Sequence, residues 1–401
     1  MKWYKLLNNA WKSFSTKKKI NGEYNLPYIK SFAKNYKIRL TIIAQHLNRR
    51  DYKFGKWKAT FIPKKDGGKR PLVIPQSIND KLVLKAISEY LSNVLSNIFN
   101  SVSSISYAYQ KGKSSRDALI QLKRIHNPQN ILLKIDIKHF FDEIDKTILI
   151  QLLNEHPIDA YVKDLISKGL SPIIDYSALD KSDIEKFPQG GIPQGNPISA
   201  ILSNLYLYEL DKLSISNGWK MVRYADDMVF SVSNFEEAKL ILSQVEKYLL
   251  DKRKLRIHPL SDSSNEKTNI YKNPKKERMK YLGIIFDGQN LFPTDERCSL
   301  LIDKIKTILS SKTTCEEIDK EIKKTIAQWC GYYAFTDISN RQLKMMNNAI
   351  FHHINKCKLN ISDINIIDVV LKTRKRQNSL LGRLFYPLRF GEEYEWLNFY
   401  K

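Results

Sequence analysis

The sequence KMVRYADDMVFSV, residues 220–232, carries the strongest structural signal in the chain. Apolar residues lie on both sides of a short polar centre, and this pattern predicts two strands joined by a tight turn. The turn carries two adjacent carboxylates, Asp226 and Asp227. Neighbouring like charges repel each other unless a cation lies between them, and Mg²⁺ prefers carboxylate oxygens. The stretch therefore predicts either a metal site or a hairpin whose aspartates only shape the turn.

A third carboxylate follows a second apolar run. The sequence ILLKI at 131–135 predicts a buried strand that leads into Asp136, and Phe140 and Phe141 follow shortly after. An acidic side chain at the end of an apolar strand is costly to bury unless it binds something. Asp142, by contrast, fits a helix N-cap or turn position. Asp136 is therefore the candidate partner of the two aspartates at 226 and 227.

The whole chain has 401 residues, of which 42% are hydrophobic, so it is long enough for two or three globular domains. Its net charge is +24, and residues 1–70 hold 19 Lys and Arg against three acidic residues. Such a basic segment suits a polyphosphate partner such as nucleic acid. Aromatic residues within it either stack on bases or form an ordinary core: Trp3, Tyr4, Trp11, Tyr24, Tyr28, Tyr36 and Trp57.

Cysteine spacing and hydropathy favour a reduced protein. The four cysteines show no C-x-x-C spacing, so we expect neither a zinc site nor a disulfide framework. The N-terminus lacks the continuous apolar run of a signal peptide, and no stretch is long and apolar enough to span a bilayer. We therefore expect a cytoplasmic protein with no membrane partner.

Residues 61–75, FIPKKDGGKRPLVIP, predict a second hairpin because Asp-Gly-Gly lies between two short apolar runs. Its turn and flanks carry Lys64, Lys65, Lys69 and Arg70. These cations either contact a triphosphate or only keep an exposed loop soluble.

The remaining periodicity is mainly helical. Asn196 as N-cap and Pro197 at the first helical position predict a helix start after the Gly/Pro/Gln-rich residues 187–195. Thr314 and Glu317 fit a capping box. Residues 281–288, YLGIIFDG, predict another strand and turn. We expect helices over 1–55, 80–99, from 116 onward, over 200–213 and 235–250, and in the tail.

Taken in order, these patterns resemble the motifs of reverse transcriptases, most closely those of the bacterial group II intron-like branch. The sequence from Asp136 to Asp142 resembles the first palm motif, PQG at 193–195 with Ser199 the second, and YADD at 224–227 the third. Lys267-Thr268 resembles the fourth motif and YLG at 281–283 the primer grip. Residues 62–75 and 106–118 resemble fingers motifs, and WCGYY at 329–333 resembles the thumb or maturase X region.

The resemblance implies an α+β right-hand polymerase fold with fingers, palm and thumb, an RRM-like palm sheet and a helical thumb. We place a basic N-terminal extension at 1–55 and fingers at 56–125. The palm, with finger insertions, occupies 126–292. A helical thumb with an X-like region and the C-terminal tail occupies 293–401.

The resemblance also implies RNA-directed DNA synthesis with two Mg²⁺ ions per active site. Asp136, Asp226 and the backbone carbonyl of Ile137 would hold the metals, with Asp227 beside them, and Lys267 would protonate or neutralise the leaving pyrophosphate. An aromatic ring at the position of Phe141 would exclude a 2′-hydroxyl. The residues implied in dNTP binding are Lys64, Arg70, Ile137, Phe141, Gln194 and Gly195.

The expected partners are a structured non-coding RNA as template, a DNA primer and product, and dNTPs. We expect nine basic residues to hold the RNA: Lys17, Lys18, Lys19, Arg49, Arg50, Lys372, Arg374, Lys375 and Arg376.

Three departures from the family pattern refine the expected role. Asn196 follows Gly195 where intron enzymes usually have a second glycine, no Cys/His endonuclease module follows the thumb motif, and the Val-Thr-Gly motif of retron enzymes is missing. These departures favour the unclassified and defence-associated bacterial reverse transcriptases, so we expect a role in antiviral defence. The alternatives are an intron-type maturase without an endonuclease and an RNA-binding maturase or scaffold.

Overall fold

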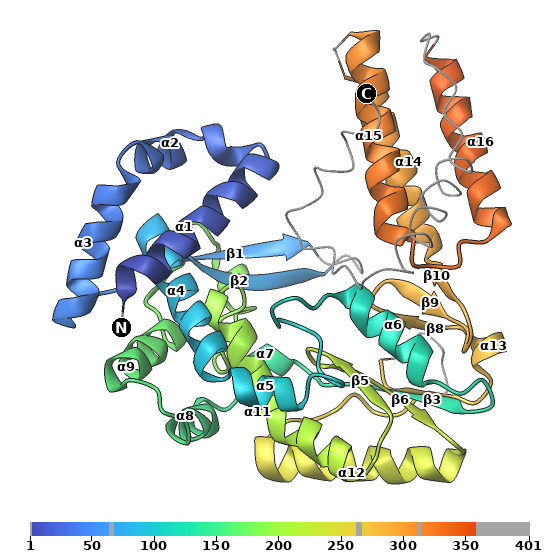
Figure 1. Ribbon diagram of the computed structural model, residues 1–401, viewed down its shortest axis with the longest axis horizontal. Coiled ribbons are helices and arrows are strands. Elements are labelled where there is room, and N and C mark those ends of the chain that lie inside the picture. Colours follow the sequence, from blue (N-terminus) through green and yellow to red (C-terminus); the bar gives the residue numbers. More distant parts are fainter. Residues whose placement is uncertain (1, 64–67, 262–266, 312–313, 358–401) are drawn as a thin grey trace. The chain divides into compact units, whose positions relative to one another are not determined.

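A computed structural model describes residues 2–63, 68–261, 267–311 and 314–357 (Figure 1). The chain forms two compact units. Unit 1 comprises Met1–Lys111, Ile135–Met228 and Lys239–Pro259, and unit 2 comprises Gly112–Lys134, Val229–Ala238 and Leu260–Lys401. The division into extension, fingers, palm and thumb is a functional one, and its boundaries stay a prediction.

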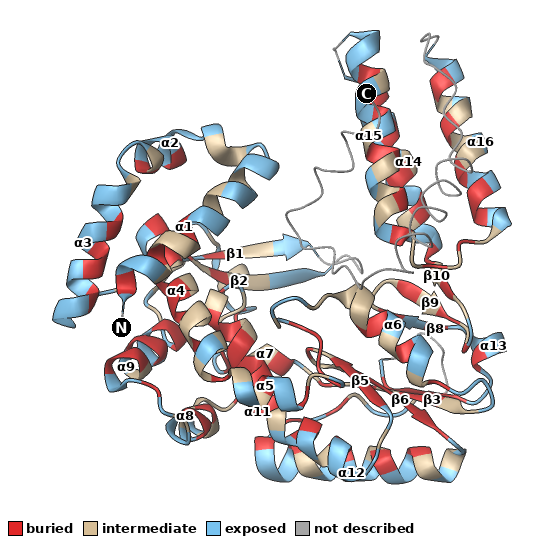
Figure 2. Cartoon of the chain, in the orientation of Figure 1, coloured by how far each residue is buried: buried red, intermediate tan, exposed pale blue. Residues whose placement is uncertain are grey.

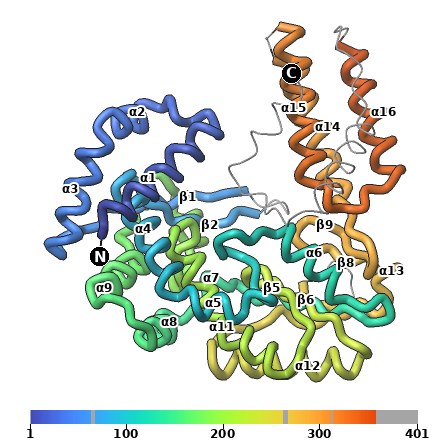
Figure 3. Tube along the Cα trace, in the orientation of Figure 1, coloured from blue at the N-terminus to red at the C-terminus, as the bar shows by residue number. Residues whose placement is uncertain are grey.

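The basic N-terminal segment of unit 1 is helical, as predicted, with α1 (Trp3–Ile20), η1 (Glu23–Asn25), α2 (Pro27–Lys34) and α3 (Tyr36–Arg49). Helix α1 packs against α3 and against α4 (Ile78–Val94), as the chain trace in Figure 3 shows. Trp3, Trp11 and Trp57 are buried, and the Trp11 ring lies 4.9 Å from that of Phe32. Base stacking is therefore the wrong interpretation for these three tryptophans, because apolar packing already covers them.

The predicted hairpin at 61–75 is confirmed as β1 (Trp57–Pro63) and β2 (Lys69–Pro75). The strands pair antiparallel, with Pro63 opposite Lys69 and Trp57 opposite Pro75. Strand β4 (Ile174–Asp175) adds to β1 in parallel and completes the order β2-β1-β4. Residues 64–67, which include Lys64, lie outside the described residues.

Helix α11 (Pro197–Ser216) forms the centre of unit 1 and contacts α4, α8 (Lys146–Asn154) and α9 (Ala160–Leu170). Asn196 caps it as predicted, because its side chain accepts a hydrogen bond from the backbone N–H of Ile198. Figure 2 shows α11 buried along much of its length. Unit 1 also contains α5 (Ser96–Ser101), α7 (Phe140–Glu143), α10 (Lys181–Ile184) and, from Lys239 onward, α12 (Phe235–Arg253).

The strands predicted at 131–136 and 221–232 are also confirmed. They are β3 (Ile131–Asp136), β5 (Met221–Tyr224) and β6 (Asp227–Val232), and with β7 (Asn269–Tyr271) they form a sheet of order β5-β6-β3-β7. Strands β3 and β7 pair antiparallel. Most of the buried side chains of this sheet are apolar, and Leu133, Val222 and Val229 among them are fully buried.

The first helix of unit 2 is α6 (Ser115–Ile125). Ser114 and Asp117 form a capping box at its N-terminus. After α13 (Pro274–Glu277), three short strands, β8 (Met279–Tyr281), β9 (Ile284–Phe286) and β10 (Leu291–Pro293), form an antiparallel sheet. The strand predicted to start at Tyr281 is therefore two strands. Leu282 and Gly283 both adopt left-handed backbone angles, which reverse the chain after β8.

Three longer helices follow in unit 2: α14 (Asp295–Leu309), α15 (Cys315–Tyr333) and α16 (Asn340–Lys356). Helix α14 packs against both of the others. The predicted capping box of Thr314 and Glu317 is confirmed at the start of α15. No helix in the described ranges is both long enough and apolar enough to cross a membrane.

Candidate active site

The two segments that carry the candidate metal-binding aspartates lie on neighbouring strands of one sheet. Asp136 is the last residue of β3, Asp227 is the first residue of β6, and Asp226 lies in the two-residue turn before it. All three are half-buried. The turn is tight because Ala225 adopts a left-handed backbone with φ of 59°. Two segments that are far apart in the sequence thus lie on neighbouring strands.

The segment after α12 fixes the backbone around Asp136. The N–H of His258 donates to the carbonyl of Asp136 at 2.9 Å, and Ile137 forms an antiparallel bridge with Ile257. The Nε2 atom of His258 lies 3.9 Å from Oδ2 of Asp136. Sequence reasoning missed His258, because nothing in the sequence near it signals a partner so distant along the chain.

The chemistry of the donors suits Mg²⁺, a hard cation that takes carboxylate oxygens. Half-buried acids at strand ends are costly unless a cation compensates them, and Asp136, Asp226 and Asp227 are such acids. Among the described residues, no three His, Cys, Asp or Glu side chains form a preassembled cluster that could hold a metal. The three residues therefore supply the type of donor atom that Mg²⁺ prefers. The two-metal site stays a prediction.

Tyr109 is a neighbour of the aspartate turn that sequence reasoning also missed. Burial raises the pKa of its hydroxyl, and the charge of Asp226 raises that pKa further. The guanidinium of Arg70 acts on the same pKa in the opposite direction, so Arg70 lies within electrostatic reach of this hydroxyl. The Tyr109 hydroxyl is protonated at neutral pH, as an unshifted tyrosine would also be, and can donate a hydrogen bond.

Helix α7 contains Phe141 and is hydrogen-bonded to the loop that carries Gln194. The N–H of Ile192 donates to the Phe141 carbonyl at 2.8 Å, and Nε2 of Gln194 donates to Oδ1 of Asp142 at 2.8 Å. Of the two roles predicted for Asp142, helix N-cap or turn residue, the N-cap is therefore wrong. Asp142 lies inside α7, whose N-cap is His139, and its carboxylate binds Gln194 instead.

Two glycines let this loop approach its neighbours closely. A Cβ atom at Gly191 would lie 2.2 Å from the Phe141 carbonyl oxygen, and one at Gly195 would lie 2.7 Å from Cγ2 of Ile74. Both glycines also have positive φ angles, of 71° and 97°. Because the Gln194 carbonyl accepts a hydrogen bond from the N–H of Val73, the loop lies against the strand that carries Arg70.

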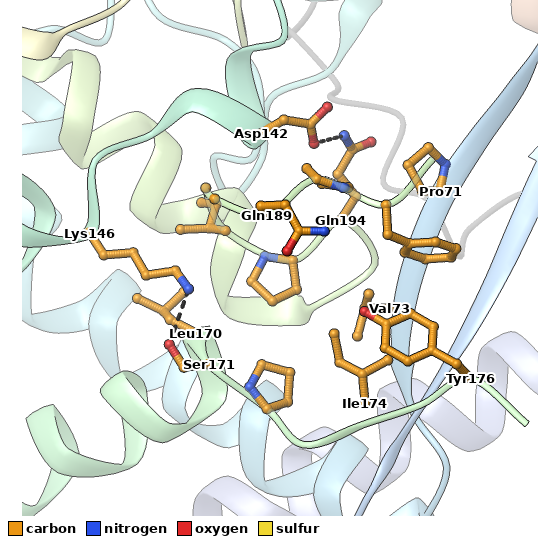
Figure 4. A pocket seen from close by; sticks show the side chains of 17 residues that line it. Pro71, Val73, Asp142, Lys146, Leu170, Ser171, Ile174, Tyr176, Gln189 and Gln194 are labelled. Carbon is orange, nitrogen blue, oxygen red and sulfur yellow. Dashed lines mark hydrogen bonds between the residues drawn. The ribbon is translucent and has the colours of Figure 1, made fainter. Parts of the chain in front are cut away.

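A cavity of about 290 Å³ adjoins Gln194 (Figure 4). Its walls come from β2, the segment around Tyr176, and residues 187–194. The Phe187 ring lies 4.9 Å from the Phe61 ring and 5.5 Å from the Tyr176 ring. The cavity therefore lies beside Gln194, one of the residues predicted to bind the dNTP.

The structure describes two of the three cationic residues predicted for the active site, Arg70 and Lys267. Arg70 is exposed on β2, opposite Ile62 of β1. Lys267 is exposed just before β7 and belongs to unit 2, so its role at the site stays a prediction. Lys64 lies outside the described residues.

Five of the nine predicted RNA-binding residues lie within the described ranges. Lys17 and Lys19 are exposed in the last turn of α1, and Lys19 lies 4.9 Å from the Tyr24 ring. Lys18 pairs with Glu23. Arg49 is exposed at the end of α3, and Arg50 lies 3.5 Å from the carboxylate of Asp159. Four predicted residues lie outside the described ranges: Lys372, Arg374, Lys375 and Arg376.

One further residue was missed although the sequence carried a signal for it. Arg223 lies between apolar residues in the strand that leads into the aspartate turn, and it is only 1% exposed. Arginine is almost never so buried unless it is paired. The signal was therefore a charged residue in the middle of an otherwise apolar strand.

Residues 62–286, more than half of the chain, match the family described as reverse transcriptase (RNA-dependent DNA polymerase). The chain belongs to this family. The match confirms the fold class predicted from the sequence, an α+β right-hand polymerase fold.

Relatives and solved structures extend the comparison. The chain is 25% identical to the putative COX1/OXI3 intron 1 protein of Saccharomyces cerevisiae over 71% of its own length and 30% of that protein's. It is 32% identical to the group II intron-encoded protein LtrA of Lactococcus lactis over 42% of its own length and 27% of LtrA. The chain thus spans less than a third of these relatives. The apo telomerase structure from Candida tropicalis aligns with a TM-score of 0.48 and 14% identity, covering 86% of this chain and 69% of the telomerase chain.

Proposed function

We propose that the protein is an RNA-directed DNA polymerase whose active site is built on Asp136, Asp226 and Asp227. The observation that carries the proposal is that Asp136 ends β3, while Asp227 begins the adjacent strand β6 and Asp226 directly precedes it, within the segment that matches the family. In this reaction the 3′-hydroxyl oxygen of a primer attacks the α-phosphorus of a dNTP. A new phosphodiester bond forms, and the bond to pyrophosphate breaks.

Asp136 and Asp226 would hold Mg²⁺ together with the carbonyl of Ile137, and Asp227 would lie beside them. When bound, two Mg²⁺ ions stabilise the attacking and leaving oxygens of such a displacement. Arg70 would contact the triphosphate, because a guanidinium forms charge-assisted hydrogen bonds with phosphate oxygens. Lys64 and Lys267 would supply further positive charge to the phosphates.

The sugar and base would be selected by the residues around α7. Phe141 would place its ring against C2′ of the incoming nucleotide and exclude a 2′-hydroxyl. Gln194 and Gly195 would line the nascent base pair. The hydrogen bonds of Gln194 with Asp142 and Val73 support this by fixing the loop. These roles rest on the family motifs and on how the loop packs.

Asp136→Asn and Asp226→Asn test the assignment. Each substitution removes one charge that the metals need, so we expect dNTP incorporation on a primed RNA template to fall below detection while thermal unfolding is unchanged. Asp164→Asn is the matched control, since Asp164 is an exposed acid on α9. Near-normal incorporation by either active-site variant in the presence of Mg²⁺ would refute the assignment.

We further propose that the template is one dedicated non-coding RNA and that the biological role is antiviral defence. Asn196 after Gly195 supports this, because it departs from the intron-enzyme pattern and here serves as the N-cap of α11. The second candidate is an intron-type maturase, which the names of the two intron-encoded relatives favour. Sequencing the RNA and DNA that co-purify with the protein distinguishes the roles. One enriched RNA with complementary DNA supports the first, and intron RNA supports the second.

A further inference from the structure

Arg223 makes an unusually complete set of contacts for a side chain in an apolar strand. A guanidinium has five N–H donors, and five hydrogen bonds are formed here. The Nε and Nη2 atoms donate to the two carboxylate oxygens of Asp211, and Nη2 also donates to Oγ of Ser106 at 2.9 Å. The Nη1 atom donates to Oδ1 of Asn204 at 3.1 Å and to the carbonyl of Ala225 at 2.9 Å.

The partners of Arg223 come from three separate segments of unit 1. Asp211 and Asn204 lie on α11, and Asn204 also donates to the carbonyl of Ala108 at 2.6 Å. The backbone of Arg223 pairs with the same segment, because its carbonyl accepts from Tyr107 and its N–H donates to Ile105. Arg223 therefore joins the central helix, the segment 105–108 and the aspartate hairpin.

Stability alone is a weak explanation for this arrangement. A buried ion pair often contributes no more to stability than apolar side chains of similar volume. The informative contact is the bond to the Ala225 carbonyl, because Ala225 immediately precedes Asp226 and adopts a left-handed backbone at φ of 59°. Alanine disfavours this conformation, so the turn depends on the contacts that hold it.

We propose that Arg223 is a positioning residue that fixes the turn before Asp226, with Asp211 and Asn204 holding its guanidinium in place. The inference rests on the proposed function of Asp226 and assigns the support of that carboxylate to a buried network. Groups that orient a metal ligand typically contribute roughly 10–100-fold to metal affinity or activity. Arg223 acts on Asp226 through the backbone, without contacting the substrate.

The primary test is Arg223→Lys in the full-length protein, measured in two ways. Lysine keeps the positive charge that pairs with Asp211. Its single ammonium group cannot reproduce all the hydrogen bonds that the planar guanidinium makes to Asp211, Asn204, Ser106 and Ala225. We expect hydrogen exchange, followed by mass spectrometry without metal, to speed up in the peptide 221–228. On a primed RNA template we expect kcat to fall by about 10–100-fold with KM for dNTP little changed. Ser203→Ala is the control, since this buried hydroxyl donates to the Ala200 carbonyl within α11.

A double-mutant cycle with Ala225→Gly separates positioning from packing. Glycine adopts the left-handed conformation without strain, so the turn should depend less on Arg223. We expect Arg223→Lys to cost several-fold less in kcat when residue 225 is glycine. Equal costs in the two backgrounds would overturn the proposal, as would unchanged exchange of peptide 221–228.

Two further outcomes are covered: a variant that does not fold, and a wild type that incorporates no dNTP. If Arg223→Lys does not fold, Ser106→Ala removes the hydroxyl that accepts from Nη2 of Arg223 and should change exchange in the same direction to a smaller extent. No change would again overturn the proposal. If the wild type incorporates no dNTP, the proposed function fails, while the exchange of peptide 221–228 still decides whether Arg223 holds the turn.

Discussion

Phe141 is the residue whose substitution should change the choice of sugar. Its ring lies in α7 beside Phe140, five residues after Asp136, and it is half-buried. In Phe141→Val the smaller side chain should leave room for a 2′-hydroxyl. We expect kcat/KM for rNTP relative to dNTP to rise by about 10–200-fold, the range of a single apolar contact in a selective pocket.

Primer extension with matched dNTP and rNTP substrates measures this ratio. Phe14→Val, at a half-buried phenylalanine of α1, is the control and should leave the ratio unchanged. If wild type and Phe141→Val use rNTPs equally well, Phe141 only contributes to packing.

His126 predicts a pH dependence of stability that is independent of catalysis. Its Nδ1 atom lies 3.0 Å from Oγ of Ser231, its ring packs 5.4 Å from that of Phe286, and burial lowers its pKa to about 4. The unfolded chain, with an ordinary pKa near ~6.5, therefore takes up the proton first as the pH falls. The stabilising contribution is complete above that pH and declines toward pH 4.

Between pH 7.5 and 5.5 this linkage should lower the free energy of unfolding by roughly 1 kcal/mol. Urea unfolding of the wild type and of His126→Gln at both pH values measures the effect. The variant should lack this part of the decrease. Parallel pH dependences would show that His126 is not the group responsible.

At the scale of an element, the β1-β2 hairpin should act on nucleotide affinity. Arg70 is exposed on β2, the strand whose Val73 N–H bonds to the Gln194 carbonyl. Arg70→Ala should raise KM for dNTP by about 10–150-fold, the equivalent of one charge-assisted hydrogen bond at ~1.5–3 kcal/mol. Lys58→Ala, an exposed cation on β1, should leave KM unchanged. Unchanged kinetics for Arg70→Ala would mean that the hairpin's charge serves only solubility.

The sequence predicted the elements whose signals are local. The two hairpins, the N-cap at Asn196 and the capping box at Thr314 each depend on residues within a few positions of one another. The turn at Leu282 was missed because leucine is not a typical residue for a left-handed backbone. Asp142 was misassigned because Gln194, which it binds, lies in a distant loop.

The same distinction applies to the candidate site. The aspartates could be found from motifs, because each motif is a short run of residues. The contacts of His258 with Asp136 and of Arg223 with Asp211 depend on how distant segments pack, and no spacing in the sequence indicates them. The burial of Trp3 and Trp11 likewise depends on α1 packing against other helices.

At the scale of the whole molecule, the charge of +24 should matter most for RNA binding. Deletion of α1 is a poor test, because it would also remove Trp3, Leu7 and Trp11 from the core. Charge reversal at Lys17 and Lys19 changes two exposed residues and leaves that core intact. We expect Lys17→Glu/Lys19→Glu to weaken RNA binding. The slope of the logarithm of the binding constant against the logarithm of the salt concentration should become shallower by about two.

Affinities for the co-purifying RNA at several salt concentrations measure this slope. Lys247→Glu/Lys252→Glu on α12 changes the net charge equally and is the matched control. Equal slopes for the two double variants would mean that overall charge, rather than the end of α1, governs RNA binding.

Template-directed incorporation of dNTPs tests the central claim most directly. Purified wild-type protein is given a DNA primer annealed to RNA, the four dNTPs and Mg²⁺, with Asp226→Asn assayed in parallel. The account predicts a complementary DNA product that requires the RNA template and is absent with Asp226→Asn. No extension by the wild type on any primed RNA, including the RNA that co-purifies with it, would contradict the account, as would equal extension by the variant.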